Sequence, residues 1–302
     1  MKSRKWGFTI VELLVVITII ALLMALIFPV LSMAREGARR TQCITNVQQL
    51  CKGAQGYAID KGNFPPLFGS PLNGVVVGWP VYMLPRIERQ DLWDQITGKG
   101  VIANAQPALQ VIIPVYMCPS DPPESAGDLS PLSYAANAGM ADVTGNTYLP
   151  PDWKANGVFH RFDNQGQSWQ PERVDMGFIQ KYDGNRNTIC ITENCNMVNW
   201  QGKTEPDVGV VWQLSPATAF NRDLTGACDY AHARPSSKHS GGFVTGFCDG
   251  HVNFVNEAID YTVYARLMTP DGRTTRPANQ TSPSPIGNQA TVLTATELQV
   301  LQ

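Results

Sequence analysis

A long apolar run near the N-terminus constrains this chain more than any other feature of its sequence. From Leu13 to Val30 the only polar side chain is that of Thr18, and none is charged. A run of about 18 apolar residues is long enough to cross a bilayer as a helix, so the segment predicts a membrane span. The rest of the chain must therefore be compatible with attachment to a membrane helix.

The residues around the run distinguish it from an ordinary anchor. Glu12 lies at its N-terminal end, and an ionised carboxylate costs about 2.5–3.5 kcal/mol at full membrane depth. Residues 1–7 carry three basic side chains and no acidic one, and they end in Gly7. Pro29, near the far end, is expected to kink a helix. A plain signal peptide would leave Glu12 and Pro29 unexplained.

The most specific motif reads Gly7-Phe8-Thr9-Ile10-Val11-Glu12-Leu13-Leu14-Val15-Val16, followed by Ile19-Ile20-Ala21 and Pro29. In this order the residues resemble the N-terminus of type IV pilins and pseudopilins. The resemblance implies cleavage after Gly7 by a prepilin peptidase on the cytoplasmic face, and N-methylation of Phe8. It also implies that inner-membrane assembly machinery joins the chain to other pilin or pseudopilin subunits through this helix, with Glu12 and Pro29 as assembly residues.

The physical properties of Glu12 agree with this resemblance. After cleavage the Phe8 ammonium would lie four residues from Glu12, and residues i and i+4 share one helix face. In a stack of helices the same carboxylate could neutralise the ammonium of a neighbouring subunit, which would compensate its burial. The alternative is a secretory signal peptide cleaved after Ala34, and a mature N-terminus at Phe8 or at Arg35 distinguishes the two.

The helix is predicted to continue past the membrane segment. Over residues 43–58, apolar side chains recur at spacings of three and four, as on one face of an amphipathic helix. A Pro-Pro pair at 65–66 ends the pattern. We therefore expect one helix over residues 8–61 with a transmembrane half at about 8–31. The alternative is an independent short helix after a break at Gly37.

Residues 62–268 are predicted to form an extracytoplasmic head, and residues 269–302 a mobile tail. The chain holds 26 Gly and 22 Pro, which favours turn-rich β-structure in the head, with one short helix near 87–96. The fold class is thus α+β, a long N-terminal helix packed on a β-rich head. Short apolar runs predict strands at 74–77, 111–117, 157–159, 188–192, 208–212 and 242–254, the last folded into a hairpin with a two-residue turn at Asp249-Gly250.

A second motif lies in this hairpin. His239 is followed by nine residues and then by Asp249-Gly250. This H-x(9)-D-G signature resembles a large family of pseudopilin-like bacterial proteins that is named for the motif and whose head has no assigned function. The resemblance extends to about residue 272. Further matches follow in the family's order, among them Arg40-x-x-Cys43-x-x-Asn46 and Cys118-Pro119-Ser120-Asp121.

The seven cysteines allow up to three disulfides if the head lies outside the cytoplasm. Their connectivity cannot be read from the sequence. Cys43 and Cys51 lie eight residues apart on the predicted helix, where they either anchor it covalently to the head or only pack against it. No pair of cysteines has a spacing that predicts a zinc site.

The head carries side chains that could serve acid-base chemistry, but no catalytic motif accompanies them. Neither a metalloprotease, a serine hydrolase nor a phosphate-binding motif is present, so no enzymatic activity is expected. A structural calcium site at Asp183, Asn185 and Asn187 is the one cofactor suggested, although the distal bidentate Glu of a complete calcium loop is missing. The candidate groups are His160, His232, His239, His251, Asp183, Asp229, Asp249 and Glu193.

Two classes of function remain. The first is a structural subunit of a pilus or a type II secretion pseudopilus, held in the cytoplasmic membrane by one span with the N-terminus in the cytoplasm, or incorporated in a periplasmic or extracellular filament. The second is a membrane-tethered module that binds a glycan, a peptide or a secreted substrate. Exposed tryptophans among Trp153, Trp169, Trp200 and Trp212 would favour it. A formal net charge of −2 gives no reason to expect a nucleic-acid partner.

Overall fold

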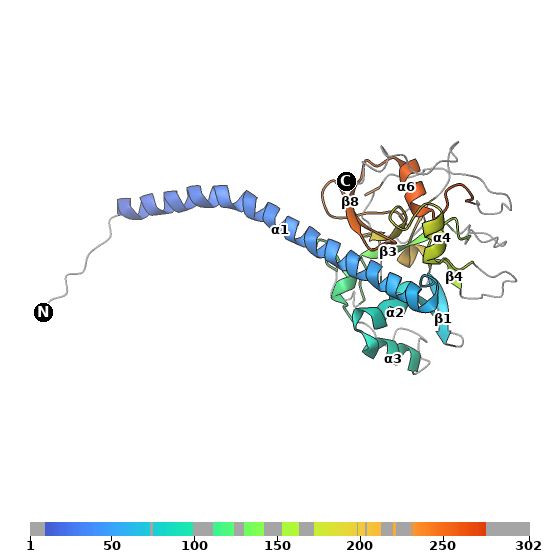
Figure 1. The fold of residues 1–302 in the computed structure, drawn as a ribbon. Coiled ribbons are helices and arrows are strands. Elements are labelled where there is room, and N and C mark those ends of the chain that lie inside the picture. Colours follow the sequence, from blue (N-terminus) through green and yellow to red (C-terminus); the bar gives the residue numbers. More distant parts are fainter. Residues whose placement is uncertain are drawn as a thin grey trace.

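A long helix projects from a head built of short strands and helices (Figure 1). This architecture confirms the α+β class predicted from the sequence. The leader, residues 1–7, and Phe8 lie outside the described residues. The computed structural model describes residues 10–72, 75–98, 111–123, 130–141, 153–162, 172–197, 199–202, 204–212, 220–221, 230 and 232–275.

The elements of the head are short compared with the first helix. The helices are α1 (Ile10–Lys61), α2 (Trp79–Met83), α3 (Gln90–Gly98), α4 (Met176–Lys181), α5 (Glu205–Val208) and α6 (Tyr261–Met268), with 3-10 turns η1 (Leu84–Ile87) and η3 (Pro114–Tyr116). The strands are β1 (Phe68–Leu72), β2 (Val75–Gly78), β3 (Tyr134–Met140), β4 (Arg161–Phe162), β5 (Ile189–Glu193), β6 (Gly209–Trp212), β7 (Gly242–Phe247) and β8 (Val252–Asn256).

The strands form two sheets. The larger has the order β6-β3-β5-β7-β8, with β3 and β6 parallel and the other neighbours antiparallel. The smaller has the order β2-β1-β4, antiparallel between β1 and β2 and parallel between β1 and β4. Every residue of β3, β5, β6 and β7 is buried, and successive side chains of a strand point to opposite faces, so both faces of the larger sheet are covered. α1 packs against β5, β7 and β8, and α6 packs against β5 and β6.

α1 is continuous from Ile10 to Lys61, so the alternative of a break at Gly37 is wrong. Its 52 residues make it about 78 Å long. Pro29 lies inside it, and Figure 1 shows that the helix is curved. Side chains of the second half reach the head at the predicted spacings of three and four, and the fully buried ones are Cys43, Val47, Leu50, Cys51 and Ala54.

A glycine in β7 allows this close packing. Gly246 faces the point where Val47 and Cys51 of α1 meet the sheet, and a Cβ atom there would overlap both side chains. The helix therefore approaches the backbone of β7 directly. At β8 the contact is different, because the Arg40 guanidinium lies over the Phe254 ring, 3.3 Å from its centroid.

Several short elements differ from those predicted. Residues 111–117 contain η3 instead of a strand, because Pro114 lacks an N–H group and fixes φ. Residues 157–159 bend ahead of β4 and belong to no strand. The helix predicted near 87–96 begins later, at Gln90, since η1 occupies the preceding turn. β3 is not predicted at all, because its sequence YAANAGM consists mainly of small residues that carry little strand preference.

The packed head extends past the predicted boundary at residue 268. Thr269, Asp271 and Thr275 are buried, and the Gly272 amide donates to Asp183 Oδ2 at 2.8 Å. Composition suggested a mobile tail from 269, but the polar side chains here bond to the turn instead: Asp271 accepts a hydrogen bond from the Thr274 hydroxyl at 2.7 Å. The rest of the predicted tail, 276–302, lies outside the described residues.

Candidate functional site

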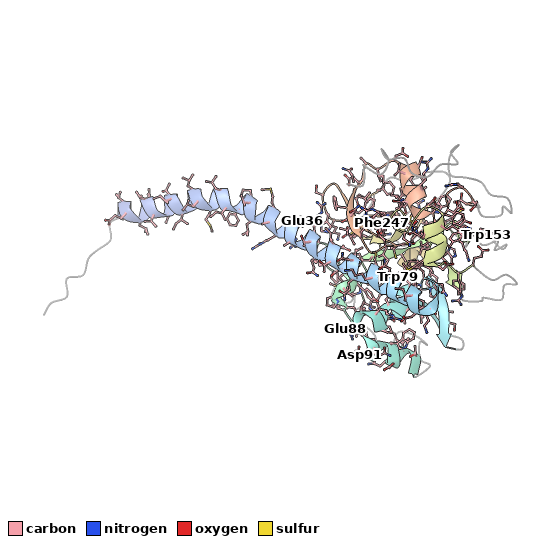
Figure 2. All side chains as sticks on the ribbon, in the orientation of Figure 1. Glu36, Trp79, Glu88, Asp91, Trp153 and Phe247 are labelled. Atoms are coloured by element: carbon pink, nitrogen blue, oxygen red, sulfur yellow. A yellow bond between two sulfur atoms is a disulfide. The ribbon has the colours of Figure 1, made fainter. Side chains whose placement is uncertain are left out.

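The N-terminal part of α1, residues 10–33, is not covered by the head; we call it the bare half. Its large apolar side chains are 41–83 % exposed, and Figure 2 shows them projecting from the helix along its length. Among the described helices, α1 is the one long and apolar enough to cross a membrane, with a mean hydropathy of 3.1 in an 18-residue window. An apolar surface of this size marks contact with a membrane or another protein.

Polar groups within the bare half are satisfied by the helix itself. Thr18 Oγ1 donates to the Leu14 carbonyl at 2.6 Å, and Ser32 Oγ donates to the Phe28 carbonyl at 3.1 Å. In hydrocarbon such internal bonds replace those to water. Glu12 is then the only ionisable side chain between residues 10 and 33. The predicted cleavage and methylation residues Gly7 and Phe8 lie outside the described part of the chain.

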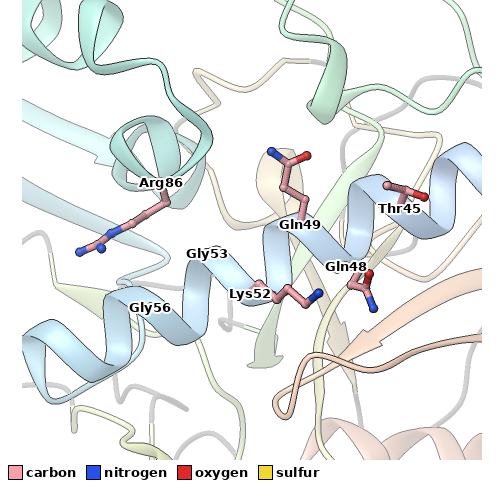
Figure 3. A pocket seen from close by; sticks show the side chains of 7 residues that line it. All are labelled: Thr45, Gln48, Gln49, Lys52, Gly53, Gly56 and Arg86. Atoms are coloured by element: carbon pink, nitrogen blue, oxygen red, sulfur yellow. The ribbon is translucent and has the colours of Figure 1, made fainter.

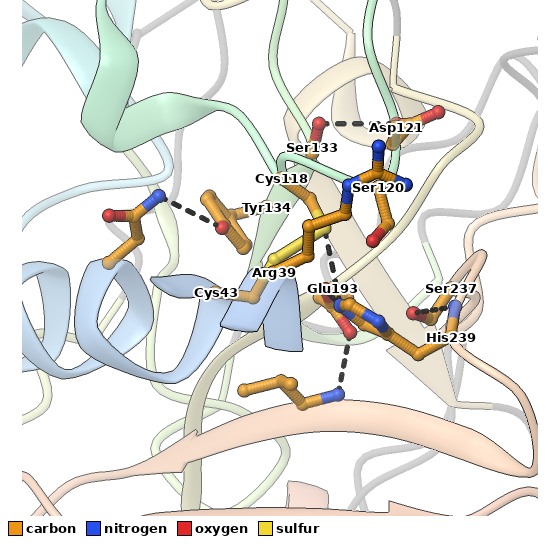
Figure 4. Close-up of polar contacts among 12 residues, drawn as sticks. Arg39, Cys43, Cys118, Ser120, Asp121, Ser133, Tyr134, Glu193, Ser237 and His239 are labelled. Atoms are coloured by element: carbon orange, nitrogen blue, oxygen red, sulfur yellow. Dashed lines mark hydrogen bonds and ion pairs between the residues drawn. A yellow bond between two sulfur atoms is a disulfide. The ribbon is translucent and has the colours of Figure 1, made fainter. Parts of the chain in front are cut away.

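A group of polar side chains, all buried except the partly exposed Glu36, lies where α1 enters the head; we call it the base cluster. It contains a disulfide between Cys43 of α1 and Cys118, drawn in yellow in Figure 4, together with His239, Glu36 and Glu193. Its centre is His239, whose side chain is 1 % exposed. His239 Nδ1 lies 2.5 Å from Glu36 Oε1, and His239 Nε2 lies 3.4 Å from both Glu193 Oε1 and Cys118 Sγ.

The base cluster joins segments that are far apart in the sequence. Glu36 also accepts a hydrogen bond from Ser120 Oγ at 3.2 Å, next to the disulfide. One turn beyond Cys43, the Asn46 amide donates to the Met117 carbonyl at 2.9 Å and to the Tyr134 hydroxyl at 3.3 Å. The disulfide and these hydrogen bonds therefore fasten α1 to residues 117–120 and to β3.

Burial and the neighbouring carboxylates act on the pKa of His239 in opposite directions. Burial lowers the pKa of this imidazole, but Glu193 and Glu36 raise it by more, so that the net pKa is above the ordinary value. Glu193 is held by β5, and its Oε2 accepts the Val244 amide of β7 at 2.7 Å. Its Oε1 makes no hydrogen bond with the described residues, although it is buried. The polar group that faces this oxygen is His239 Nε2, at 3.4 Å.

The other end of the H-x(9)-D-G signature also holds α1. The Gln55 amide donates to the Cys248 carbonyl at 2.8 Å, beside Gly250, whose φ is +85°. His239 thus contacts α1 at Glu36, Asp249-Gly250 lies at Gln55, and β7 runs between them along the helix. The signature therefore fastens α1 ahead of the segment that packs on the head, residues 43–58, and again near the C-terminal end of that segment, which we call the covered half.

The hairpin turn itself is one residue longer than predicted. Phe247 N donates to His251 O at 3.0 Å, so three residues, 248–250, form the loop. Asp249 Oδ1 accepts the His251 amide at 3.1 Å, and Gly250 supplies the positive φ that closes a three-residue loop. Asp249 therefore serves turn geometry.

The remaining described cysteines are thiols. Cys51, Cys190 and Cys248 are fully buried, and burial raises the pKa of each. Cys195 is partly exposed, and burial raises the pKa of its thiol as well. Of the two helix cysteines, Cys43 anchors α1 covalently and Cys51 only packs.

The outer face of the covered half carries a groove of about 400 Å³ (Figure 3). It lies between α1 and η1, and five of its seven lining residues have polar or charged side chains, although most of the lining surface is apolar. Because Gly53 and Gly56 have no side chains there, Arg86 of η1 lies close to the helix. The lining residues are Thr45, Gln48, Gln49, Lys52, Gly53, Gly56 and Arg86.

The suggested calcium ligands are engaged within the protein. Asp183 accepts the Gly272 amide, the Asn187 amide donates to the Asp183 carbonyl at 2.9 Å, and the Asn185 amide donates to Gln180 Oε1 at 3.3 Å. These contacts account for the turn without an ion, and calcium binding stays a prediction.

The tryptophans do not offer an exposed platform in the part of the chain that is described. Trp200 and Trp212 are fully buried, and their indole N–H groups donate to the carbonyls of Val111 and Asn156. Trp153 is partly buried, and Trp169 lies outside the described residues.

Comparison with known families agrees with the geometry of both regions. Residues 3–28 match the prokaryotic N-terminal methylation motif, which with the bare half defines a pilin-like chain with a single-pass membrane anchor. Residues 32–262 match a family described as protein of unknown function (DUF1559), and the chain belongs to that family. Both resemblances predicted from the sequence are thereby confirmed. No curated protein and no solved structure shows significant similarity.

The role of Glu36 was not predictable from a motif. It lies seven residues before Cys43, so both side chains fall on one face of the helix, and this spacing is the signal that could have drawn attention to it. Glu193 was among the candidate groups, but its proximity to His239 depends on the pairing of β5 with β7.

Proposed function

We propose that this chain is a structural pilin-like subunit that a prepilin peptidase cleaves between Gly7 and Phe8. Methylation then modifies Phe8, and the bare half of α1 assembles with other pilin or pseudopilin subunits into a pilus or a type II secretion pseudopilus. The observation that supports this is the coincidence of the methylation motif at 3–28 with an uncovered apolar helix at 10–33.

The bare half needs a different partner at each stage. Before assembly, one membrane span with the head outside the cytoplasm covers its apolar side chains, each of which gains about 1.5–3 kcal/mol on burial. Within the membrane, apolar surface alone does not drive helices together. Pairing of Glu12 with the Phe8 ammonium of a neighbour would supply a specific attraction and fix the axial offset between subunits.

The head has a mechanical part in this proposal. The base cluster and the hairpin fasten the covered half of α1, so the helix and the head move as one body. Stacked helices would then fix the positions of their heads on the filament surface. This role is structural and requires no catalytic group.

The test uses Glu12→Gln, with Glu88→Gln as a matched control on the exposed surface of the head. We expect both variants to begin at methylated Phe8 by mass spectrometry of the mature chain, and only Glu12→Gln to be lost from sheared filaments. A wild-type N-terminus at Arg35 would contradict processing as proposed. Normal incorporation of Glu12→Gln would contradict assembly and favour a tethered binding module.

A further inference from the structure

The base cluster has the composition of a transition-metal site. Cys43 Sγ, Cys118 Sγ, Glu193 Oε1 and His239 Nε2 all lie within 4.8 Å of one another, and all four residues are buried. Thiolate sulfur, imidazole nitrogen and carboxylate oxygen are the ligand types that zinc takes in proteins. We propose that these four side chains bind one Zn²⁺ ion when Cys43 and Cys118 are in the dithiol form.

Two distances already have the values of a tetrahedral site. Ligands at about 2.0–2.3 Å from a central zinc ion lie about 3.3–3.8 Å from one another. His239 Nε2 is 3.4 Å from Glu193 Oε1 and 3.4 Å from Cys118 Sγ. Reduction breaks the bond between the two sulfur atoms, which then move apart to nonbonded contact. Two thiolates bound to one zinc ion require this separation. Small side-chain movements therefore complete the site.

The contact at Nδ1 of His239 suits metal binding at Nε2. Glu36 Oε1 lies 2.5 Å from Nδ1 and can accept the hydrogen on that nitrogen while zinc takes the place of a proton at Nε2. A carboxylate behind the ligating imidazole is the usual outer partner in zinc sites. Glu36 thus acts as a positioning residue and not as a ligand.

The surroundings of Glu193 also point to a cation. Its Oε2 accepts the Val244 amide, but its buried Oε1 accepts no hydrogen bond among the described residues and faces His239 Nε2 at 3.4 Å, the second atom that would hold the ion. A divalent ion would compensate this oxygen together with two thiolates. Figure 4 shows Glu193 and His239 on the same side of the disulfide, so the ion would lie between them and the sulfur atoms.

The zinc form and the disulfide form exclude each other. A dithiol reductant supplies two electrons and two protons, which convert the Cys43–Cys118 bond into two thiols while the reductant becomes a disulfide. Zinc displaces both thiol protons without a redox change. Both forms fasten α1 to residue 118, and the zinc form adds direct bonds to β5 and to the H-x(9)-D-G histidine. The chain is thus held together before the disulfide forms.

Sequence spacing could not show this site because each ligand comes from a different segment. Cys43 lies on α1, Cys118 follows η3, Glu193 ends β5 and His239 precedes β7. A zinc motif is recognisable when its ligands come in close pairs, and here none do.

The experiment uses the full chain in detergent, reduced with a phosphine under anaerobic conditions and titrated with Co²⁺ and then Zn²⁺. We expect one equivalent of Co²⁺ to give thiolate-to-cobalt charge-transfer absorption and tetrahedral visible bands, which Zn²⁺ abolishes. The oxidised chain should bind neither ion. Absence of the thiolate band in the reduced wild-type chain would overturn the proposal, and this comparison needs no variant that has to fold.

Variants then assign the ligands. Cys43→Ser with Cys118→Ser should abolish the thiolate band, whereas Cys195→Ser removes a thiol outside the site and should retain it. Glu36→Gln should weaken zinc binding about 10–100-fold without changing the ligand set, as expected for an outer-shell partner. Retention of the thiolate band in the double variant would place the ion elsewhere and overturn the assignment.

Discussion

The two halves of α1 belong to one continuous helix but have opposite surroundings. In the bare half, residues 10–33, every large apolar side chain is exposed. In the covered half, residues 43–58, most apolar side chains lie on one face and are buried in the head together with Asn46, while most polar residues take the other face. A helix that is apolar all round must find a membrane or other helices, and an amphipathic one needs only a single partner surface.

This difference separates two kinds of stability in one element. The bare half is helical through its own backbone bonds and depends on the solvent around it. The covered half is fastened at Cys43, along β7 and at Gln55. Changes in the head should therefore loosen the covered half and leave the bare half unaffected.

Removal of the disulfide should have the largest effect on the stability of the head. The Cys43–Cys118 bond closes a loop with a sequence separation of 75, and such a loop is expected to stabilise the folded chain by about 4 kcal/mol. We expect Cys43→Ala with Cys118→Ala, kept in a chelator, to lose this amount in denaturant unfolding. Hydrogen exchange should speed up at residues 43–58 and not at 13–30. Equal loss of protection in both halves would contradict the comparison.

Matched leucines in the two halves should give the next largest effect. Leu50 is fully buried, so Leu50→Ala should destabilise the head by about 3 kcal/mol through lost burial and a residual cavity. Leu23 is 53 % exposed, and Leu23→Ala should leave the melting temperature of the head unchanged in detergent. A similar loss in both variants would show that the bare half packs on the head in solution.

These two regions also differ in how far the sequence predicts them. The bare half and the buried stripe of the covered half follow from local composition and from spacings of three and four, which belong to the helix itself. The hairpin follows from Asp249-Gly250, because glycine accepts the positive φ of the turn. Such features need only neighbours in sequence.

The base cluster could be predicted only in part. His239 is visible as a signature residue, but its partners Glu36 and Glu193 come from α1 and from β5, and only the tertiary fold brings them together. The order β6-β3-β5-β7-β8 likewise depends on nonlocal pairing, and β3 has too few large side chains to be recognised.

The stability of the head should depend on pH through Asp183. Burial raises its pKa to about 6, so the folded state binds a proton that the unfolded state releases near pH 4. Because the pKa is higher in the folded state, the free energy of unfolding should fall as the pH rises from 4 to 6 and stay constant above that range. The fall should be about 1–2 kcal/mol, after allowance for the partial exposure of Asp183. Urea unfolding at several pH values measures this, and Asp183→Asn should flatten the profile. An unchanged profile in that variant would assign the dependence to other groups.

The smallest expected effect isolates one contact between the hairpin and the covered half. Gly250 and Gly241 share a φ of +85°, so alanine at either position should lose about 1–2 kcal/mol from backbone strain alone. A Cβ at Gly250 would lie 3.1 Å from the Gln55 carboxamide, whereas one at Gly241 would meet nothing within 4 Å. Gly250→Ala should therefore cost about 1 kcal/mol more, as the hydrogen bond from Gln55 to Cys248 weakens. Faster exchange confined to the end of α1 around Gln55 would locate that loss. If the two alanine variants unfold at the same urea concentration, the turn does not fasten the helix, and the histidine end of the signature alone does.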